Sequence, residues 1–352
     1  MPKVLHVIED LECGGHAEQL RLVASATRAA GESVAVASLR RPGPVAAPLC
    51  AAGVPVEWLG WRSAVDPYAA VRLRRLARRL RVDAVQTWDA ASDRAVRWSR
   101  AGRGKAVWAA VDRGGAAGPR RRLAGADLVF GPYEAADGAA SAAGRLVRTP
   151  NAVDPTIAGA HTDRAAARER LRAGGIRLGD DAVVILAVAR QESPEAVRQL
   201  AWAADLIRVV NPAIRLLIAG GGRGSAAAQR FAAAATEPGL VSWLGPWPDL
   251  RDLYAAADVA WCSGSGGPQS TPALEACLAG LPLVVAGAAA APIDGIIVAD
   301  LADRAGWARA TLAALKSPRT APPAAALADH APDVVAKRQV EGIAEAMSRP
   351  RC

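Results

Sequence analysis

The sequence predicts an α/β fold made of two doubly wound domains, each with a parallel sheet between layers of helices. Short apolar runs alternate with helical patterns along most of the chain, which is typical of strand–helix–strand units. The length of 352 residues is sufficient for two separate cores. The alternation stops at Pro150 and Asn151, passes through a polar, Arg-rich connector at residues 159–181 and then restarts. We therefore place a domain boundary near Ala158.

On this basis residues 1–157 form the first domain, residues 158–331 the second, and residues 332–352 a last helix that returns towards the first. Strands are expected in the first domain at residues 4–8, 34–39, 56–59, 84–87, 106–111, 127–130 and 146–149. In the second domain they are expected at residues 183–188, 215–218, 241–244, 258–262, 283–285 and 295–298.

The composition indicates a globular protein and leaves its partners open. Hydrophobic residues make up 51% and charged residues 22% of the chain, so disorder is excluded. The formal net charge of +9 permits attraction to phosphates, nucleic acid or an anionic membrane without distinguishing them. The five cysteines are scattered at no metal-ligand spacing, and no apolar run is long enough to span a bilayer. We expect no metal and a cytoplasmic protein, either free or peripheral at the inner membrane face.

The segment WCSGSGGPQSTPALEACLAGLP, residues 261–282, reads as a buried strand, a loop of small residues and a helix entered through Ser270, Thr271 and Pro272. Such a loop lets a ligand approach the backbone, and the helix N-terminus attracts phosphate. Glu275, one turn into the helix, could accept hydrogen bonds from sugar hydroxyls. A nucleotide sugar would satisfy both features. The alternative is an ordinary strand–loop–helix with Glu275 as a solvated acid.

Other candidates lie at the ends of first-domain strands. Gly14 and Gly15 follow a strand and precede a helix, where open α/β sheets bind ligands, but no third glycine stands at dinucleotide spacing. Trp88 and Asp89 follow another strand and are candidates for an acceptor site, with structural packing as the alternative. His6 and most of the tryptophans, Trp58 among them, are expected to pack in the protein.

Residues 68–82, YAAVRLRRLARRLRV, keep Leu73, Leu76 and Leu80 at helical spacing. The other faces carry Arg72, Arg74, Arg75, Arg78, Arg79 and Arg81. One interpretation is a surface helix with solvated arginines. The other is peripheral contact with an anionic membrane that carries a lipid-linked acceptor. Nucleic acid is not expected as a partner, because no binding motif accompanies the arginines.

Seven blocks together resemble, in order, the GT-B retaining glycosyltransferases of family GT4, also called group 1. They are VLHVIEDLECGGHAEQL, AVQTW, RTPNAVDP, VILAVAR, IRLLIAGGG, VSWLGPWPDLRDLYAAADV and ALEACLAGLPLVV. The resemblance implies two Rossmann-like domains facing each other across a cleft. It implies transfer of a sugar from a nucleotide-diphosphate donor, with retention and without metal, to a glycan, lipid or small-molecule acceptor, as in polysaccharide biosynthesis.

The resemblance also implies roles for single residues. Gly14 and Gly15 match a glycine loop that lines the donor phosphates. Arg190 matches a basic residue that pairs with the diphosphate, for which a guanidinium has suitable bidentate geometry. In the helical segment, Ser270 and Thr271 match positions that meet the phosphates, and Glu275 matches the glutamate assigned to the ribose.

Three positions depart from the family pattern. Gly267 stands in the donor loop where the first of two glutamates is expected, and Glu195 and Ala196 stand where a lysine is expected. Asp112 stands where the family has a histidine. Asp112 and Arg190 are the two candidate catalytic residues. Asp112 could accept a hydrogen bond from the donor sugar, but it would repel a diphosphate. The alternative to an active transferase is therefore a catalytically degenerate GT-B protein serving as a regulatory or scaffolding subunit. Other GT-B chemistry, such as sugar-nucleotide epimerisation, is a third reading.

Overall fold

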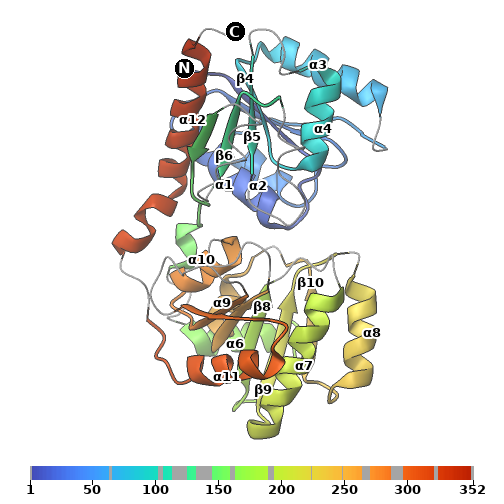
Figure 1. Cartoon of the computed structure of the whole chain (residues 1–352), viewed down its shortest axis with the longest axis vertical. Coiled ribbons are helices and arrows are strands. Elements are labelled where there is room, and N and C mark those ends of the chain that lie inside the picture. The colour runs from blue at the N-terminus through green and yellow to red at the C-terminus, as the bar shows by residue number, and fades with distance from the viewer. Residues whose placement is uncertain are drawn as a thin grey trace. The chain divides into compact units, whose positions relative to one another are not determined.

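The computed structural model describes residues 2–62, 66–101, 106–112, 125–131, 145–158, 163–188, 194–222, 224–247, 249–263, 270–286, 296–320 and 324–349. The chain divides into two compact units, one formed by Met1–Val153 with Ala328–Cys352 and the other by Asp154–Leu327 (Figure 1). Each unit contains one parallel sheet with helices between its strands. The predicted α/β class with two doubly wound sheets is confirmed.

The first unit has a seven-stranded sheet of order β3-β2-β1-β4-β5-β6-β7. Its strands are β1 Val4–Ile8, β2 Val34–Ser38, β3 Val56–Trp58, β4 Ala84–Thr87, β5 Val107–Val111, β6 Leu128–Gly131 and β7 Arg145–Arg148. All neighbouring strands are parallel. The strand order reverses between β1 and β4, and the carboxyl ends of strands beside such a reversal are where open sheets bind ligands.

Both faces of this sheet are covered because successive side chains of a strand point to opposite sides. In β1, Val4 and Ile8 belong to a core shared with α1 Gly15–Ala29, α2 Ala46–Ala51 and α12 Pro332–Ser348. Leu5 and Val7 belong to a second core, shared with α3 Pro67–Leu80 and α4 Ala90–Ser99. Figure 1 shows α12 running alongside this sheet.

The second unit has a six-stranded parallel sheet of order β10-β9-β8-β11-β12-β13, which reverses between β8 and β11. Its strands are β8 Val183–Val188, β9 Ile214–Ala219, β10 Val241–Gly245, β11 Val259–Cys262, β12 Leu283–Ala286 and β13 Ile296–Ala299. The α-helices are α6 Arg164–Ala173, α7 Pro194–Val210, α8 Ser225–Ala235, α9 Arg251–Ala256, α10 Thr271–Leu278 and α11 Arg304–Ala314. In the described ranges, the 3-10 helix η1 Pro155–Ile157 begins this unit, and the 3-10 helix η4 Ala324–His330 crosses from it into the first unit.

Two expectations were wrong. The predicted connector at residues 159–181 contains helix α6. Its helical pattern is hard to recognise in the sequence because arginines interrupt the few apolar positions. One of them, Arg168, is itself buried, donating to the Ala256 carbonyl at 3.1 Å and to Asp258 at 2.8 Å. Trp58 was expected to be packed, yet its side chain is 61% exposed at the edge strand β3, with the indole donating to the Arg40 carbonyl. Within the described ranges, no helix combines the length and apolar character needed to cross a membrane.

Candidate functional site

The predicted strand–loop–helix of the second unit starts at β11, next to the reversal of strand order. Ser270 is the N-cap of α10, in extended backbone, and its carbonyl accepts from the Leu274 amide at 3.0 Å. The Ser270 hydroxyl makes no cap hydrogen bond, and it interacts instead with the Cys262 thiol. Burial raises the pKa of Cys262 far above its ordinary value, so this thiol stays neutral. The cysteine is therefore a packing residue rather than a nucleophile.

Glu275, one turn into α10, is buried, with 4% of its surface exposed. The Tyr254 hydroxyl, from α9, donates to Glu275 Oε2 at 2.9 Å. Burial, followed by the nearby Glu275 carboxylate, raises the pKa of Tyr254 well above its ordinary value. Tyr254 therefore keeps its proton and remains a hydrogen-bond donor to the carboxylate. The glutamate is held in one orientation, and is not the solvated acid of the alternative interpretation.

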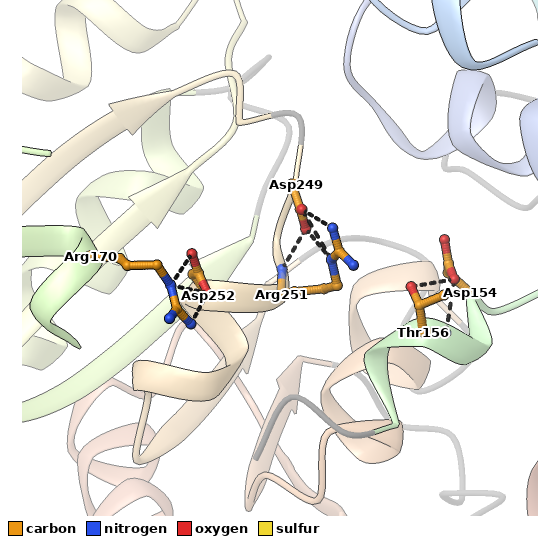
Figure 2. Close-up of polar contacts among 6 residues, drawn as sticks. All are labelled: Asp154, Thr156, Arg170, Asp249, Arg251 and Asp252. Carbon is orange, nitrogen blue, oxygen red and sulfur yellow. Dashed lines mark hydrogen bonds and ion pairs between the residues drawn. The ribbon is translucent and has the colours of Figure 1, made fainter. Parts of the chain in front are cut away.

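Two arginine–aspartate pairs hold the start of α9, the helix that carries Tyr254 (Figure 2). Arg251 pairs with Asp249 at 2.5 Å, and this contact raises the pKa of the arginine and lowers that of the aspartate. Arg170, from α6, pairs with Asp252 at 2.7 Å. These bidentate pairs fix the start of the helix more firmly than a single contact would.

The far ends of α9 and α10 are joined by Arg319. Its guanidinium donates to the carbonyl oxygens of Ala255 at 2.9 Å and Ala257 at 3.2 Å, both at the end of α9. It also donates to the Ala279 carbonyl, at the end of α10, at 3.3 Å. A cation is favoured at a helix C-terminus, and here one serves two helices. The helices that carry Tyr254 and Glu275 are therefore fixed relative to each other.

The first residues of the second unit contact α10 through η1. Asp154 caps η1, because its Oδ1 accepts from the Thr156 amide at 2.9 Å and from the Thr156 hydroxyl at 2.7 Å (Figure 2). Ile157, the last residue of η1, is buried. α10 is thus supported by η1 as well as by α9.

In the first unit, Gly14 and Gly15 stand at the start of α1. Gly14 is the N-cap, in extended backbone, and its carbonyl accepts from the Glu18 amide at 2.9 Å. The segment before them is closely approached by Gly43, which has a φ of +60°. A Cβ built on Gly43 would lie 2.3 Å from the Leu11 carbonyl oxygen. Gly43 is thus a support of the glycine loop that the sequence pattern did not reveal.

Trp88 and Asp89, the candidates at the end of β4, make structural contacts within the first unit. Trp88 is buried, and its indole donates to His6 Nδ1 at 3.0 Å. Asp89 forms a capping box with Ser92 at the start of α4 and accepts from the Glu9 amide at 2.8 Å. Burial raises the pKa of Asp89 in spite of these hydrogen bonds. These contacts agree with the structural interpretation of both residues and give no evidence for an acceptor site.

The remaining predicted residues are placed as follows. Asp112 follows β5, is partly buried, and its amide donates to the Phe130 carbonyl at 2.7 Å. Arg190 and Gly267 lie outside the described residues. Glu195, at the start of α7, is exposed and accepts from the Gln199 amide group at 2.7 Å. Across the described ranges, no group of three or more His, Cys, Asp or Glu side chains could hold a metal ion.

Comparisons with known proteins show what this chain resembles. Residues 182–317, within the second unit, match the family model "Glycosyl transferases group 1". HepE from Anabaena, solved with UDP and glucose, is similar with a TM-score of 0.75 and 15% identity, covering 98% of this chain and 100% of its own. The α,α-trehalose 6-phosphate synthase of Burkholderia multivorans gives a TM-score of 0.70 and 13% identity, with 98% and 99% covered.

The UDP-GlcNAc 2-epimerase of Methanocaldococcus jannaschii is also similar, with a TM-score of 0.59, 12% identity and 97% and 99% of the chains covered. A comparison with curated protein sequences gives no match. The structural likenesses extend over both units and show the GT-B fold. Residues 182–317 of the second unit match the group 1 glycosyltransferase model, so the resemblance predicted from the sequence is confirmed.

Proposed function

We propose that this protein transfers a sugar from a nucleoside diphosphate donor to an acceptor hydroxyl, with retention of the anomeric configuration. The observation that carries the proposal is Glu275, a buried carboxylate held by Tyr254 in the domain that matches the family model. An ionised carboxylate has about four acceptor positions, so Glu275 could accept from ribose hydroxyls in addition to Tyr254. Two neighbours, HepE and a trehalose-phosphate synthase, are described as UDP-bound or UDP-forming, which supports UDP as the carrier.

In this proposal the residues act chiefly on the departing diphosphate. Negative charge grows on the diphosphate as its bond to the sugar breaks, and Arg190 would stabilise that charge through paired N–H donors. Ser270 and Thr271, at the start of α10, would contribute the positive end of the helix dipole. From the first unit, Gly14 and Gly15 would line the phosphates and Asp112 would accept a hydrogen bond from the sugar.

The test is calorimetric titration of the full chain with UDP, GDP and ADP. We expect one nucleotide, UDP, to bind at about micromolar strength. Arg190→Ala should weaken that binding by about tenfold to a hundredfold, the usual range for a lost hydrogen bond to a charged group. Arg177→Ala, which removes an exposed arginine of the same unit, is the control and should bind normally. Failure of all three nucleotides to bind, or equal affinity in Arg190→Ala and wild type, would refute the donor site.

A degenerate GT-B protein that regulates or scaffolds a partner remains the second candidate. It is favoured by the acid at Glu195, exposed at the start of α7 where the resemblance expects a lysine nearby. We expect Ala196→Lys to raise UDP affinity by about fivefold if that position faces the diphosphate, because one charge pair near a surface contributes about 1 kcal/mol. Mass spectrometry after incubation with UDP-sugars and mixed acceptors separates the candidates. Released UDP with a glycosylated product indicates transfer, whereas binding without turnover indicates the regulatory role.

The likeness to the UDP-GlcNAc 2-epimerase makes epimerisation a third candidate. Incubation with UDP-sugars also tests for it. An epimerase would change the configuration of the sugar at constant mass and would need no acceptor. We propose that the acceptor is a glycan, a lipid or a small molecule, met in the cytoplasm or at the inner membrane face.

A further inference from the structure

The helical layer of α3 and α4 in the first unit has an unusual charge distribution. α3 contains no acidic residue, and both helices direct arginines to solvent. We call these side chains the arginine layer: Arg72, Arg74, Arg75, Arg78, Arg79, Arg81, Arg94, Arg97 and Arg100. The leucines at helical spacing, Leu73 and Leu76, are buried beneath it, so the arginines occupy the outer surface.

Most of this layer lacks ion-pair partners, although Asp66, the N-cap of α3, lies close enough to Arg72 for the arginine to help lower its pKa, after backbone hydrogen bonds. Arg79 pairs with Glu57 at 2.5 Å. Over the described part of the chain, no carboxylate lies within ion-pair distance of Arg72, Arg74, Arg75, Arg78, Arg81, Arg94 or Arg100. Positive potential from these side chains therefore adds up over one face of the unit and is cancelled only in part.

The opposite helical layer of the same unit shows the usual arrangement. There, cations of α1, α12 and the adjoining strand and loop form the ion pairs Arg21–Glu18, Arg145–Glu345, Arg338–Asp329 and Arg349–Glu345. Among the described residues of this unit, arginines without an ion-pair partner are thus concentrated on the α3 and α4 face.

The same face exposes large apolar side chains. Tyr68 and Val71, on the outer side of α3, are 82% and 47% exposed, and Trp98 of α4 is 55% exposed. Aromatic rings of this kind favour the boundary between the headgroups and acyl chains of a bilayer. A phosphate-rich surface with an apolar boundary beneath it would satisfy both the arginines and these side chains.

We propose that the face formed by α3 and α4 binds the surface of an anionic phospholipid bilayer. A duplex nucleic acid would offer phosphates to the arginines but no apolar boundary to Tyr68, Val71 and Trp98. The inference rests on the charge and exposure of the first unit alone, so it stands whether or not the protein transfers sugar.

The test is co-sedimentation of the full chain with vesicles of phosphatidylcholine mixed with phosphatidylglycerol, and with vesicles of phosphatidylcholine alone. We expect binding to the anionic vesicles that weakens as salt is raised. The triple variant Arg74→Gln, Arg75→Gln, Arg78→Gln should bind about a hundredfold more weakly, because each arginine near such a surface contributes about fivefold. A matched triple variant in the second unit, Arg177→Gln, Arg230→Gln, Arg309→Gln, changes the net charge equally through exposed arginines and should bind as wild type.

A second variant tests the apolar part. Tyr68→Ala with Trp98→Ala should weaken vesicle binding by about tenfold while leaving the salt dependence unchanged. Circular dichroism would establish that each variant is folded. Three results would overturn the proposal: no binding of the wild-type chain to anionic vesicles, equal losses in the two triple variants, or tighter binding to single-stranded RNA or duplex DNA than to the vesicles.

Discussion

The two units share a doubly wound architecture but differ in what lies at the reversal of their strand order. In the first unit, polar side chains beside the reversal make hydrogen bonds within the unit: the Trp88 indole donates to His6, and Asp89 caps α4. In the second unit, by contrast, a hydrogen bond from Tyr254 holds one carboxylate, Glu275, on helix α10. The match to the family model falls in the second unit. Under the proposed function, this difference predicts that substitutions near the strand reversal change stability in the first unit and nucleotide binding in the second.

If the contacts of the first unit are structural, substitution of Gly43 should affect stability strongly. We expect Gly43→Ala to lower the free energy of unfolding by about 3 kcal/mol, because the new Cβ would collide with the Leu11 carbonyl in a left-handed conformation. Gly31→Ala is the matched control: its φ is +83°, yet nothing lies within 4 Å of the added Cβ. That variant should lose about 1 kcal/mol. Equal losses in urea denaturation would show that the close approach at Leu11 is unimportant.

In the second unit, substitution of Glu275 should change the affinity for UDP. Glu275→Gln keeps the size of the side chain and an acceptor for Tyr254, but it removes the charge. We expect UDP affinity to fall by about thirtyfold, in line with a lost charged hydrogen bond. Glu237→Gln, an exposed acid of the same unit, should bind UDP normally. An unchanged dissociation constant in Glu275→Gln would remove the residue from the site and weaken the contrast between the units.

The buried His6 of the first unit predicts a dependence of stability on pH. Burial lowers its pKa from 6.5 to about 3, and its Nε2 has no partner among the described residues. Between these values the unfolded chain binds a proton that the folded chain excludes. Stability is therefore greatest above pH 6.5 and falls as the pH drops, by at most about 1.4 kcal/mol per pH unit, levelling off near pH 3. His6→Gln should remove this part of the slope when unfolding is measured against pH; identical slopes would contradict the assignment.

The sequence was sufficient to predict the fold because strong apolar periodicity marks most helices and strands. It failed where an apolar stripe was interrupted by a buried charge, as in α6, where Arg168 lies inside. The sequence also made Glu275 a candidate, from the run of small residues and the helical pattern after it; its role in binding stays a prediction. What it could not predict are contacts that only tertiary packing creates. The Tyr254 hydroxyl and the Arg319 guanidinium bind partners that are 21 and up to 65 residues away in the sequence. A local sequence pattern does not reveal contacts between residues so far apart in the chain.

The smallest expected effect tests whether Tyr254 acts through Glu275 or merely fills the core. Tyr254→Phe removes only the hydroxyl, and we expect KM for the donor to rise by about tenfold with little change in kcat. Tyr68→Phe, at an exposed tyrosine, is the control. In the double variant with Glu275→Gln, a positioning role predicts that the second substitution adds little to the first, whereas independent structural losses would add. Thermal unfolding, measured in parallel, separates lost stability from lost orientation. Additive losses would mean that the hydrogen bond between α9 and α10 supports the fold and leaves donor recognition to other residues.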